Sequence, residues 1–363
     1  MPAITISRFA SARPRHELDQ ARALAWLADA HAKLEAARDP RVDLADRVRH
    51  FARLLQRVGC GPDRIARRGH SLGDRADALV ELAGQGSEAR TRRFAELADA
   101  YFRDAYSAER EAPDDLIHVT CTGYASPSAA QKLVASRRGW TRVTHAYHMG
   151  CYAAVPALHI ASGFVANGSR RVDIAHTELC SLHFDPASTA LDQLVVQSLF
   201  GDGLIHYAVV PGDRGGLVVR ALHEQLLADS ADSMTWITGD HGNRMTLARD
   251  VPGRIASAVR GFVIALLARG GFGVAALKQA VVAVHPGGPK IVDSVQTTLE
   301  LDDSQVAHSR GVLRDFGNMS SATLPHIWMR VLDDERVAPA TLVASLAFGP
   351  GLTISGALFE KRP

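Results

Sequence analysis

The feature that most constrains the fold of this chain is a repeated alternation of short apolar, β-branched runs with longer helical segments. The runs LIHVTCTG, RVDIAHTELCSLHF and LIHYAVVP lie in the first part of the chain, and VVAV and LVASLAFGPGLTISGALFEK lie in the second. Segments with helical periodicity separate them, for example around residues 253–268. Strands that alternate with helices in both parts predict an α/β protein with largely buried sheets.

The N-terminal region lacks this alternation. Residues 15–110 are predicted to be helical, because apolar residues recur at helical spacing and charged amphipathic runs cover 42–57 and 87–109. The glycine-rich sequence PGDRGG marks the region in which we expect the two parts of the chain to meet. We therefore divide the chain into an N-terminal and a C-terminal half, residues 1–220 and 221–363.

Charge and cysteine content exclude several classes of protein. The chain has 41 Lys and Arg residues against 39 Asp and Glu residues, and a net charge of +2 argues against a general nucleic-acid binder. Four cysteines in 363 residues form no disulfide framework, and no CxxC pair indicates a zinc site.

No segment has the pattern of a signal peptide or a membrane span. The N-terminus lacks an uninterrupted apolar stretch, and the most apolar long segment, 259–284, is broken by Arg260, Arg269 and Lys278. We therefore expect a soluble, reduced, cytoplasmic protein.

Cys151 is the strongest candidate nucleophile. It follows Gly150 where a strand-like stretch gives way to an alanine-rich helix. The positive end of a helix dipole and the exposed amide donors favour a thiolate and lower the thiol pKa. The alternative is a buried structural cysteine, but the small residues on both sides permit close approach to the sulfur.

Two later residues complete a set suited to acyl transfer. His285 follows VVAV and precedes PGGP, at the carboxyl end of a predicted strand, and Asn318 lies in FGNMSS. Taken singly, His285 is an ordinary loop histidine and Asn318 a helix cap. A thiol, an imidazole and an amide in one site suit the chemistry of a thioester. The thiol can attack the carbonyl carbon, and the other two groups can stabilise the negative charge that its oxygen gains. Cysteine proteases use the same order of residues, but the signature expected around their cysteine is absent.

Seven segments in order resemble hallmark sequences of type III polyketide synthases, the chalcone synthase-like branch of the thiolase superfamily. They are MGCYAAVPAL, ELCSLHF, QSLFGDG, the VPG of ARDVPG, VHPGGPKIVD, FGNMSSAT and AFGPGLT, and the likeness covers residues 50–360. CTGYASPSAAQ and THAYHMGCYAA also resemble bacterial stand-alone ketosynthases that join two acyl chains into α-pyrones. The resemblance implies a homodimer with the thiolase fold, five αβαβα layers built from two similar halves.

The resemblance also implies a role for each candidate residue. Cys151 would be acylated, while His285 and Asn318 would hold the thioester carbonyl and stabilise the enolate formed when a malonyl-type extender loses carbon dioxide. An acyl-CoA or acyl-carrier-protein thioester would supply the chain, and cyclisation to an alkyl pyrone or resorcinol would release it. No metal or redox cofactor is implied.

The pocket implied by the resemblance departs from that of plant members. Phe200 matches the family's gatekeeper aromatic, and Gly349-Pro350-Gly351 matches a loop that scaffolds the cavity. Met245 stands where plant enzymes carry a second gatekeeper Phe, and a flexible apolar lining favours medium-length or longer aliphatic chains over aromatic starters. The full set of expected pocket residues is Phe200, Met245, Cys121, Cys180, His183, Val196 and Ser320.

A basic cluster lies where the family receives the phosphates of coenzyme A. It consists of Arg53, Arg57, Arg64, Arg67 and Arg68. Guanidinium groups bind phosphate well, although a solvated helix face would have the same composition. Pro62 replaces a lysine of the plant enzymes, which leaves delivery by an acidic acyl carrier protein open.

Three alternatives accompany this interpretation. The chain could join two preformed acyl or β-ketoacyl thioesters into an α-pyrone or cyclic diketone, or it could be a priming enzyme that stops after one condensation. The third is a non-catalytic partner that binds acyl carriers beside a synthase. An intact Cys, His and Asn set argues against the third alternative, since binding alone has no chemical need for all three.

Overall fold

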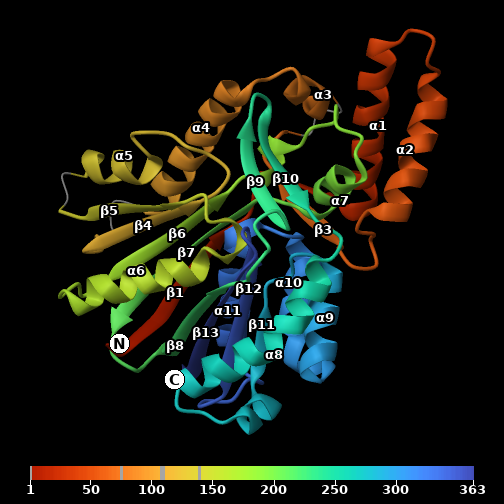
Figure 1. Ribbon diagram of the computed structural model, residues 1–363. Helices are drawn as coiled ribbons and strands as arrows, with labels where there is room; N and C mark the ends of the chain where they lie inside the picture. Colours follow the sequence, from red (N-terminus) through yellow and green to blue (C-terminus); the bar gives the residue numbers. More distant parts are fainter. Residues whose placement is uncertain (1, 74–76, 107–110, 138–139) are drawn as a thin grey trace.

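A nine-stranded mixed sheet runs through the computed structural model, which describes residues 2–73, 77–106, 111–137 and 140–363 (Figure 1). Its strands are β1 (Ile4–Ala12), β4 (Asp115–Thr120), β5 (Arg142–Tyr147), β6 (Val172–Glu178), β7 (Gly203–Pro211), β8 (Gly216–Leu226), β11 (Val281–Val284), β12 (Leu342–Gly349) and β13 (Thr353–Arg362). Their order is β11-β12-β13-β8-β1-β7-β6-β4-β5. The apolar runs of the sequence therefore all form strands, as predicted.

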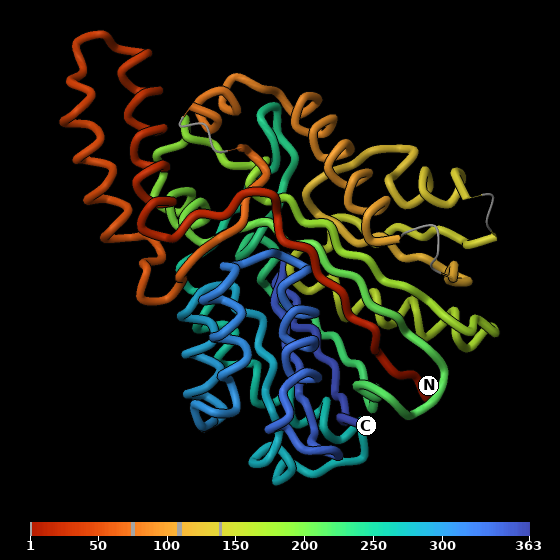
Figure 2. The backbone as a smooth tube through the Cα atoms, turned by 180° about the vertical axis from the view of Figure 1, so that it is seen from behind, coloured from red at the N-terminus to blue at the C-terminus, as the bar shows by residue number. Residues whose placement is uncertain are grey.

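Two helices occupy the space between the two halves of this sheet. α6 (Ala154–Ala166) contacts β4, β6 and β7 as well as β13, and α11 (Thr323–Asp333) contacts β7, β8 and β11. Each helix thus touches strands from both ends of the chain. The outer layers are α4 (Ser87–Ala105) and α5 (Ala129–Ser136) on one side, and α8 (Val251–Arg269), α9 (Pro289–Leu299) and α10 (Asp303–Phe316) on the other (Figures 1 and 2). This arrangement confirms the expected thiolase-type layering.

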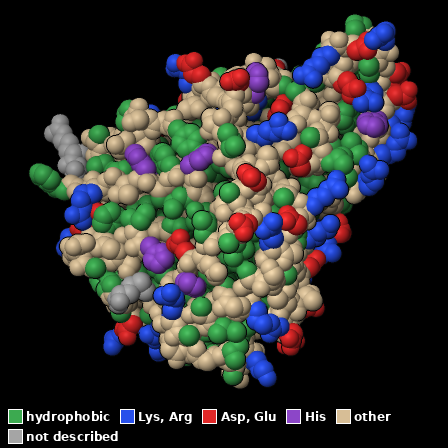
Figure 3. Space-filling model, in the orientation of Figure 1, with side chains coloured by type: hydrophobic (Ala, Val, Ile, Leu, Met, Phe, Trp, Pro, Cys, Tyr) green, Lys and Arg blue, Asp and Glu red, His purple; other side chains and the backbone are tan. Residues whose placement is uncertain are grey.

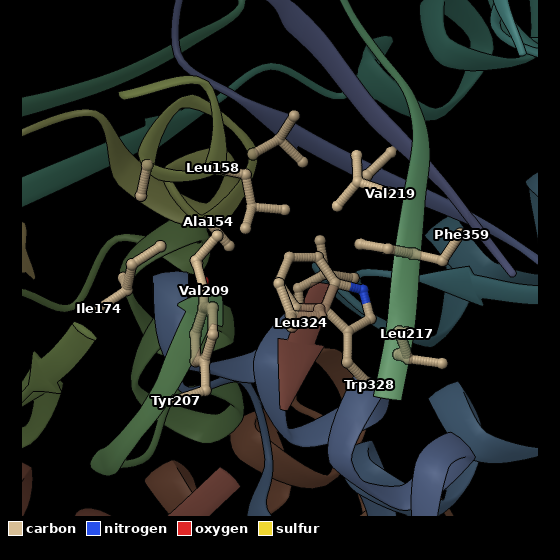
Figure 4. Close-up of a cluster of buried hydrophobic side chains, with 14 of the residues drawn as sticks. Ala154, Leu158, Ile174, Tyr207, Val209, Leu217, Val219, Leu324, Trp328 and Phe359 are labelled. Carbon is tan, nitrogen blue, oxygen red and sulfur yellow. The ribbon is translucent and has the colours of Figure 1, made fainter. Parts of the chain in front are cut away.

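The largest apolar core lies where the central helices meet the strands. Figure 4 shows Leu158 of α6 and Leu324 and Trp328 of α11 among side chains of β7, β8 and β13. Trp328 is fully buried, and its ring N–H donates to Ser345 Oγ at 2.7 Å. Burial of each large apolar side chain contributes about 1.5–3 kcal/mol to stability. Because both halves of the sheet pack on α6 and α11, this shared core holds the two halves in place relative to each other.

The expected boundary between the two halves, after residue 220, lies inside strand β8. This strand pairs with β1 from the N-terminus and with β13 from the C-terminus, both antiparallel. The two halves therefore meet inside the sheet, at β8 (Gly216–Leu226).

The N-terminal region differs from the helical prediction. α1 (Gln20–Arg38), α2 (Leu44–Val58) and α3 (Ala78–Ala83) are present, but β2 (His16–Asp19) and β3 (Arg67–His70) form an antiparallel pair. The prediction is wrong at these strands because HELD and RRGH carry no apolar alternation. The expected helix at 87–109 is α4, and residues 107–110 of that range lie outside the described part of the chain.

A hairpin after β8 was not predicted. β9 (Met234–Gly239) and β10 (Gly242–Leu247) form a separate two-stranded sheet there. One further helix, α7 (Leu191–Leu199), leads into β7. Short 3-10 turns complete the fold: η1 (Gly150–Tyr152), η2 (Cys180–His183), η3 (Val274–Gln279) and η4 (Ser320–Ala322).

Among the described residues, α8 is the helix whose length and apolar composition would suffice to cross a membrane. In this structure its apolar residues pack into the protein core. Ile255, Val259, Phe262 and Leu266 are buried, and the helix packs against β8 and β13. The first part of the apolar stretch noted in the sequence, residues 259–269, therefore belongs to a core helix, and the rest contains η3 and β11.

Candidate active site

The turn that carries Cys151 is held by a loop from the other end of the chain. Cys151 is buried on η1, between β5 and α6. Gly150 has φ +78°, and a Cβ there would lie 2.9 Å from Pro350 Cδ. A Cβ at Gly349 would overlap the Tyr152 ring. The loop between β12 and β13 therefore packs on both neighbours of Cys151, consistent with the scaffolding role predicted for it.

Asn318 and Ser320 lie beside the nucleophile. The Cys151 thiol donates to Ser320 Oγ at 3.8 Å, and the Asn318 side chain also hydrogen-bonds to it. Asn318 is fixed by its backbone, since its N–H donates to Leu199 O at 3.0 Å and its carbonyl accepts from Gly201 N–H at 2.9 Å. The Asn318 amide oxygen accepts from Ser320 N–H at 2.8 Å, which orients the amide.

His285 is placed by β11. It follows the last residue of this strand, and its backbone N–H donates to Leu346 O at 2.7 Å. The loop after it reaches Leu199, because a Cβ at Gly288 would lie 3.6 Å from Leu199 Cδ2. Leu199 also accepts the backbone bond of Asn318, so both candidate residues are anchored next to the same segment.

The His285 ring is buried without a hydrogen-bond partner. It is 1% exposed, and neither ring nitrogen has a partner among the residues that the structure describes. Burial lowers its pKa to about 3, so the imidazole is neutral at physiological pH. An unsatisfied buried polar group costs about 1–3 kcal/mol, which a bound oxygen could recover by accepting from the ring N–H.

The expected thiolate is not present in the unliganded protein. Burial raises the pKa of Cys151 to about 12, and hydrogen bonding with Ser320 and Asn318 offsets only part of this effect. Cys151 lies on the 3-10 turn before α6, in an environment where desolvation outweighs the helix dipole. The neutral His285 also gives no imidazolium partner. The thiol must therefore lose its proton as it reacts.

A small pocket adjoins this site. Five of the expected pocket residues line it, namely Cys180, His183, Val196, Phe200 and Met245. Its volume is about 20 Å³, enough for a single water but not for an acyl chain. The other two expected residues lie on the side of Cys151, where Cys121 Sγ is 3.0 Å from Ser320 Oγ.

Trp236 is a pocket residue that the sequence reasoning missed. It lies on β9, and its indole N–H donates to Cys121 O at 2.7 Å. Its ring packs edge-on against the His183 ring, with centroids 5.7 Å apart. The β9–β10 hairpin was not predicted, so nothing in the sequence pointed to a large aromatic side chain at this position.

Glu178 is a second missed residue. It is fully buried at the end of β6, where its carboxylate accepts from Thr122 Oγ1 at 3.0 Å, from Cys121 N–H at 3.1 Å and from the Ser321 hydroxyl. Burial raises its pKa. The segment ELCSLHF contains Glu178, but the resemblance supplied no role for it. Its hydrogen bonds tie β4, β6 and η4 together beneath the nucleophile.

The basic cluster divides into two groups. Arg68 is buried, and its guanidinium donates to Gln20 Oε1 at 2.7 Å, to Gln197 O at 2.8 Å and to Phe200 O. It therefore differs from the prediction, because its guanidinium is used in the core rather than offered to a phosphate. Arg53, Arg57, Arg64 and Arg67 are exposed.

No group of three or more His, Cys, Asp or Glu side chains converges on a metal-sized site within the described ranges. The groups that contact the Cys151 thiol are instead the Ser320 hydroxyl and the Asn318 amide. Such groups suit hydrogen bonding to a developing oxyanion.

Two family models match most of the chain. The model of the chalcone and stilbene synthase N-terminal domain matches residues 96–213, and that of the C-terminal domain matches residues 219–362. The chain belongs to the chalcone and stilbene synthase family. Proteins similar to this chain in sequence, and a solved structure similar to it in fold, are described next.

Two relatives illustrate the range of the family. The chain is 32% identical over 258 residues to the "alpha-pyrone synthesis polyketide synthase-like Pks18" of Mycobacterium tuberculosis, which covers 68% of this chain and 64% of the relative. It is 30% identical over 273 residues to the 1,3,6,8-tetrahydroxynaphthalene synthase of Streptomyces griseus, which covers 74% of this chain and 71% of the relative. The match therefore spans about two thirds of the length of these proteins.

The fold extends over the whole chain. The C-terminal type III polyketide synthase domain of Steely1 from Dictyostelium superposes with a TM-score of 0.84 over 99% of this chain and 100% of that domain, at 22% identity. The likeness at this low identity concerns the fold, including the N-terminal segment that the family models leave unmatched.

Proposed function

We propose that this member of the chalcone and stilbene synthase family is a condensing enzyme of the type III polyketide synthase kind. The observation that carries the proposal is the buried Cys151, flanked by Asn318, with the unpartnered imidazole of His285 anchored at the same segment. A CoA or phosphopantetheine thioester would be the substrate, and no further cofactor is proposed.

In the first step, Cys151 Sγ attacks the carbonyl carbon of the donor thioester. A new C–S bond forms, the donor C–S bond breaks, and the proton of Cys151 ends on the departing thiol. His285 and the Asn318 amide then donate to the thioester oxygen of a malonyl-type extender. As its carboxylate leaves as carbon dioxide, the negative charge moves onto that oxygen, where both donors stabilise it.

In the second step, the enolate carbon attacks the acyl carbonyl on Cys151. The new C–C bond replaces the C–S bond, and the thiolate of Cys151 takes up a proton. Release as a pyrone follows when an enol oxygen of the lengthened chain attacks the chain's own thioester carbonyl: a C–O bond forms, the C–S bond breaks, and the carrier thiol leaves with the enol proton. A resorcinol instead requires a carbanion of the chain to attack one of its ketones with loss of water, followed by hydrolysis of the thioester and loss of carbon dioxide. A neutral His285 is suited to this cycle because it donates a hydrogen bond without carrying charge into a buried site.

We expect His285→Ala and Asn318→Ala each to slow decarboxylation of malonyl-CoA by about 10²–10³-fold, because one lost oxyanion donor typically has this effect. The measurement is release of labelled carbon dioxide by the purified variants. Acylation of Cys151 should be retained at a reduced rate. Condensation at near wild-type rates in both variants would show that the two residues have only structural roles.

Three apolar side chains of the pocket, Val196, Phe200 and Met245, favour aliphatic acyl donors, since each buried methylene contributes about 0.8 kcal/mol. The pocket also has polar lining residues, but His183, Gln193, Gln197 and Asn243 already hydrogen-bond to backbone carbonyl groups. We therefore propose a preference for medium-length or longer aliphatic chains. The test incubates the protein with malonyl-CoA and equal concentrations of decanoyl-, acetyl- and coumaroyl-CoA, with products identified by mass spectrometry. Alkyl pyrones or resorcinols from decanoyl-CoA should dominate, whereas preference for coumaroyl-CoA would contradict this substrate class.

Trp236 should limit the size of the chain that fits. We expect Trp236→Gly to improve kcat/KM for dodecanoyl-CoA relative to octanoyl-CoA by at least about tenfold, because it opens space for methylene groups worth about 0.8 kcal/mol each. Ile237→Gly is the matched control, since it makes the same backbone change at a neighbouring side chain that is 62% exposed. An equal shift in both variants would exclude a specific role for Trp236.

A second candidate is the joining of two preformed chains into an α-pyrone; the name of the mycobacterial relative refers to α-pyrone synthesis, which either route would give. Supplying a β-ketoacyl thioester without a malonyl extender separates the two, because only the second reaction gives a product. We also propose a cytoplasmic homodimer. β5 ends the nine-stranded sheet, and an edge strand offers backbone groups for pairing with a second copy.

A further inference from the structure

Cys151 is joined to a buried carboxylate by a chain of hydrogen bonds. The Cys151 thiol donates to Ser320 Oγ at 3.8 Å, and Ser320 Oγ lies 3.0 Å from Cys121 Sγ. The Cys121 thiol donates to Glu178 Oε2 at 3.5 Å. The four side chains come from η1, η4, the residue after β4 and the end of β6, and none is more than 5% exposed. Four distant parts of the sequence thus meet in one continuous, buried path.

The acceptor at the end of this chain of bonds sets the direction of each of them. An ionised carboxylate can only accept, so the Cys121 thiol donates to Glu178. The Cys121 sulfur then accepts from the Ser320 hydroxyl, whose oxygen accepts from the Cys151 thiol. Each proton is therefore directed along the path, from Cys151 toward Glu178.

Ser320, the link between the two thiols, has an unusual backbone conformation. Its φ is +50°, in the left-handed region that residues other than glycine rarely adopt. Its N–H donates to the Asn318 amide oxygen at 2.8 Å, which holds the turn in place. Backbone strain of this kind is concentrated at functional sites, because the surrounding structure must impose it. In Ser320 it accompanies a hydroxyl that lies between Cys121 and Cys151.

Glu178 is suited to take up a proton and to give it back. No Lys or Arg side chain in the described part of the chain forms an ion pair with it, and Figure 3 shows Lys and Arg side chains at the surface, many of them along the N-terminal helical hairpin. Burial raises the pKa of Glu178, whereas its bonds from Ser321, Cys121 and Thr122 lower the pKa and keep the ionised form accessible. These opposing effects suit a carboxylate that changes its protonation state during a reaction.

The other titratable groups around Glu178 are thiols and one imidazole. The thiols are those of Cys121, Cys151 and Cys180, whose pKa values are raised by burial and by the Glu178 charge. On the opposite side, Ser321 donates to Glu178 Oε1 and lies 3.0 Å from His176 Nδ1. Burial lowers the pKa of His176 to about 3, so this imidazole is neutral and places no positive charge beside the carboxylate.

His285 is the weaker base of the two that could serve Cys151. Burial lowers the pKa of His285 to about 3, whereas burial raises that of Glu178 above its ordinary value of 4.5. No hydrogen bond joins His285 to Cys151 within the described ranges, since neither ring nitrogen has a partner. The continuous path from the thiol leads to Glu178 instead.

We propose that Glu178 accepts the proton of Cys151, through Ser320 and Cys121, as the thiol attacks its thioester. This inference rests on the proposed condensing function and deepens it by assigning the fate of the thiol proton. As the new C–S bond forms, the Cys151 S–H bond breaks and its proton passes to Ser320 Oγ. The Ser320 proton passes to Cys121 Sγ, and the Cys121 proton passes to Glu178 Oε2. The negative charge of Glu178 thereby moves to the oxygen of the attacked carbonyl.

The same path returns a proton when the donor leaves. The donor C–S bond breaks, and the departing thiolate takes the proton of the Ser320 hydroxyl. Ser320 is reprotonated by Cys121 and Cys121 by Glu178, so the carboxylate is ionised again. One proton has then moved from Cys151 to the departing thiol, as acyl transfer requires.

Glu178→Gln distinguishes this role from an effect of charge alone. The Glu178 charge raises the pKa of Cys151, so its removal would by itself give more thiolate and faster reaction. Loss of a proton acceptor has the opposite effect. We expect alkylation of Cys151 by iodoacetamide at pH 7 to slow at least about tenfold, because a positioned proton acceptor typically contributes about 10²–10⁴-fold. Peptide mass spectrometry gives the rate, and an unchanged or faster rate overturns the proposal.

The pH profile of alkylation is a second measurement on the same two proteins. The wild-type rate should level off near neutral pH, where Glu178 is ionised. The rate of the variant should rise by about tenfold per pH unit between pH 7 and pH 9, because the thiol must then lose its proton to the solvent. Profiles of the same shape in both proteins would contradict a proton acceptor at position 178.

Position 121 provides a matched pair of variants that leave Glu178 unchanged. Cys121→Ser keeps a group that accepts and donates a proton, whereas Cys121→Ala interrupts the path. Alkylation of Cys151 should stay within about threefold of wild type in the serine variant and slow at least about tenfold in the alanine variant. Cys60→Ala removes a buried thiol outside the path and is the control. Equal rates at serine and alanine overturn the proposal, and this pair decides it if circular dichroism shows that Glu178→Gln does not fold.

The choice of reagent separates this inference from the function on which it rests. Iodoacetamide reacts with Cys151 whether or not the protein is a condensing enzyme, so the alkylation rates test the proton path alone. Acylation of the wild-type protein by decanoyl-CoA tests the function. A wild-type protein that is acylated, with variants that alkylate at its rate, overturns the path alone. A wild-type protein that alkylates but accepts no acyl group contradicts the condensing function, and the variant rates still decide the path.

Discussion

Replacement of Cys151 by alanine is expected to abolish acyl loading. Incubation of the wild-type protein with decanoyl-CoA should add one acyl mass to the peptide that contains Cys151, and the variant should carry no adduct. Condensation should fall by a factor on the order of 10³ or more, because removal of a covalent nucleophile leaves only binding and oxyanion stabilisation. Intact-protein and peptide mass spectrometry measure both effects.

The matched control is Cys60→Ala. Cys60 is also a buried thiol, but it lies at the end of α2 and hydrogen-bonds through its backbone to Ser198. Its replacement should leave loading unchanged. An adduct that persists in the Cys151 variant on Cys121 or Cys180 would contradict the assignment of the nucleophile, since both thiols adjoin the same site.

A steep loss of stability in mild acid is the second large effect. Five buried histidines, His31, His118, His176, His285 and His326, have pKa values that burial lowers to about 3 or 4. Their pKa in the unfolded chain is about 6.5. Below that pH the unfolded state binds more protons than the folded state, so acidification favours unfolding. The stability is complete above about pH 6.5 and is lost as the pH falls toward 4.

Each such histidine adds about 1.4 kcal/mol per pH unit to the slope of the free energy of unfolding against pH. Since total stabilities are typically about 5–15 kcal/mol, five of them should unfold the protein before pH 4 is reached. Urea denaturation between pH 8 and pH 5, at fixed protein concentration, gives the free energy of unfolding. A free energy that stays constant over this range would contradict neutral buried imidazoles.

Single substitutions test the same argument. His176→Gln should reduce the slope between pH 6 and pH 5 by about one proton, or about 1.4 kcal/mol per pH unit. His241→Gln, at the exposed turn between β9 and β10, should leave the slope as it is. Equal slopes in the two variants would exclude a contribution from His176.

Much of the fold could be predicted because burial leaves a strong pattern in sequence. The strands β4, β6, β7, β11, β12 and β13 are buried on both faces, so they appear as continuous apolar runs. β2 and β3 could not be found this way, because HELD and RRGH carry charged and polar side chains without apolar alternation. The β9–β10 hairpin was missed because it lies outside the large sheet and its strands are only partly buried, so they form no continuous apolar run.

The candidate site was predictable in its chemistry but not in its electrostatics. The segments around Cys151, His285 and Asn318 identified the candidate reacting groups. The structure bonds Asn318 to Leu199 through its backbone and brings the loop after His285, at Gly288, to the same residue. The pKa of Cys151 was predicted in the wrong direction, since the depth of burial depends on the whole fold. Arg68 was misassigned because sequence does not distinguish a guanidinium that serves the core from one that serves a ligand.

The contact between Gly349 and the Tyr152 ring is expected to couple these two positions in evolution, although they are far apart in the sequence. A side chain at position 349 has no room while an aromatic ring occupies position 152, and that ring adjoins the nucleophile. A lineage can therefore alter one of these positions only if it also alters the other, or if it tolerates a displaced Cys151. Substitutions at the two sites are expected to be inherited as pairs, although 197 residues separate them in the sequence (349 − 152).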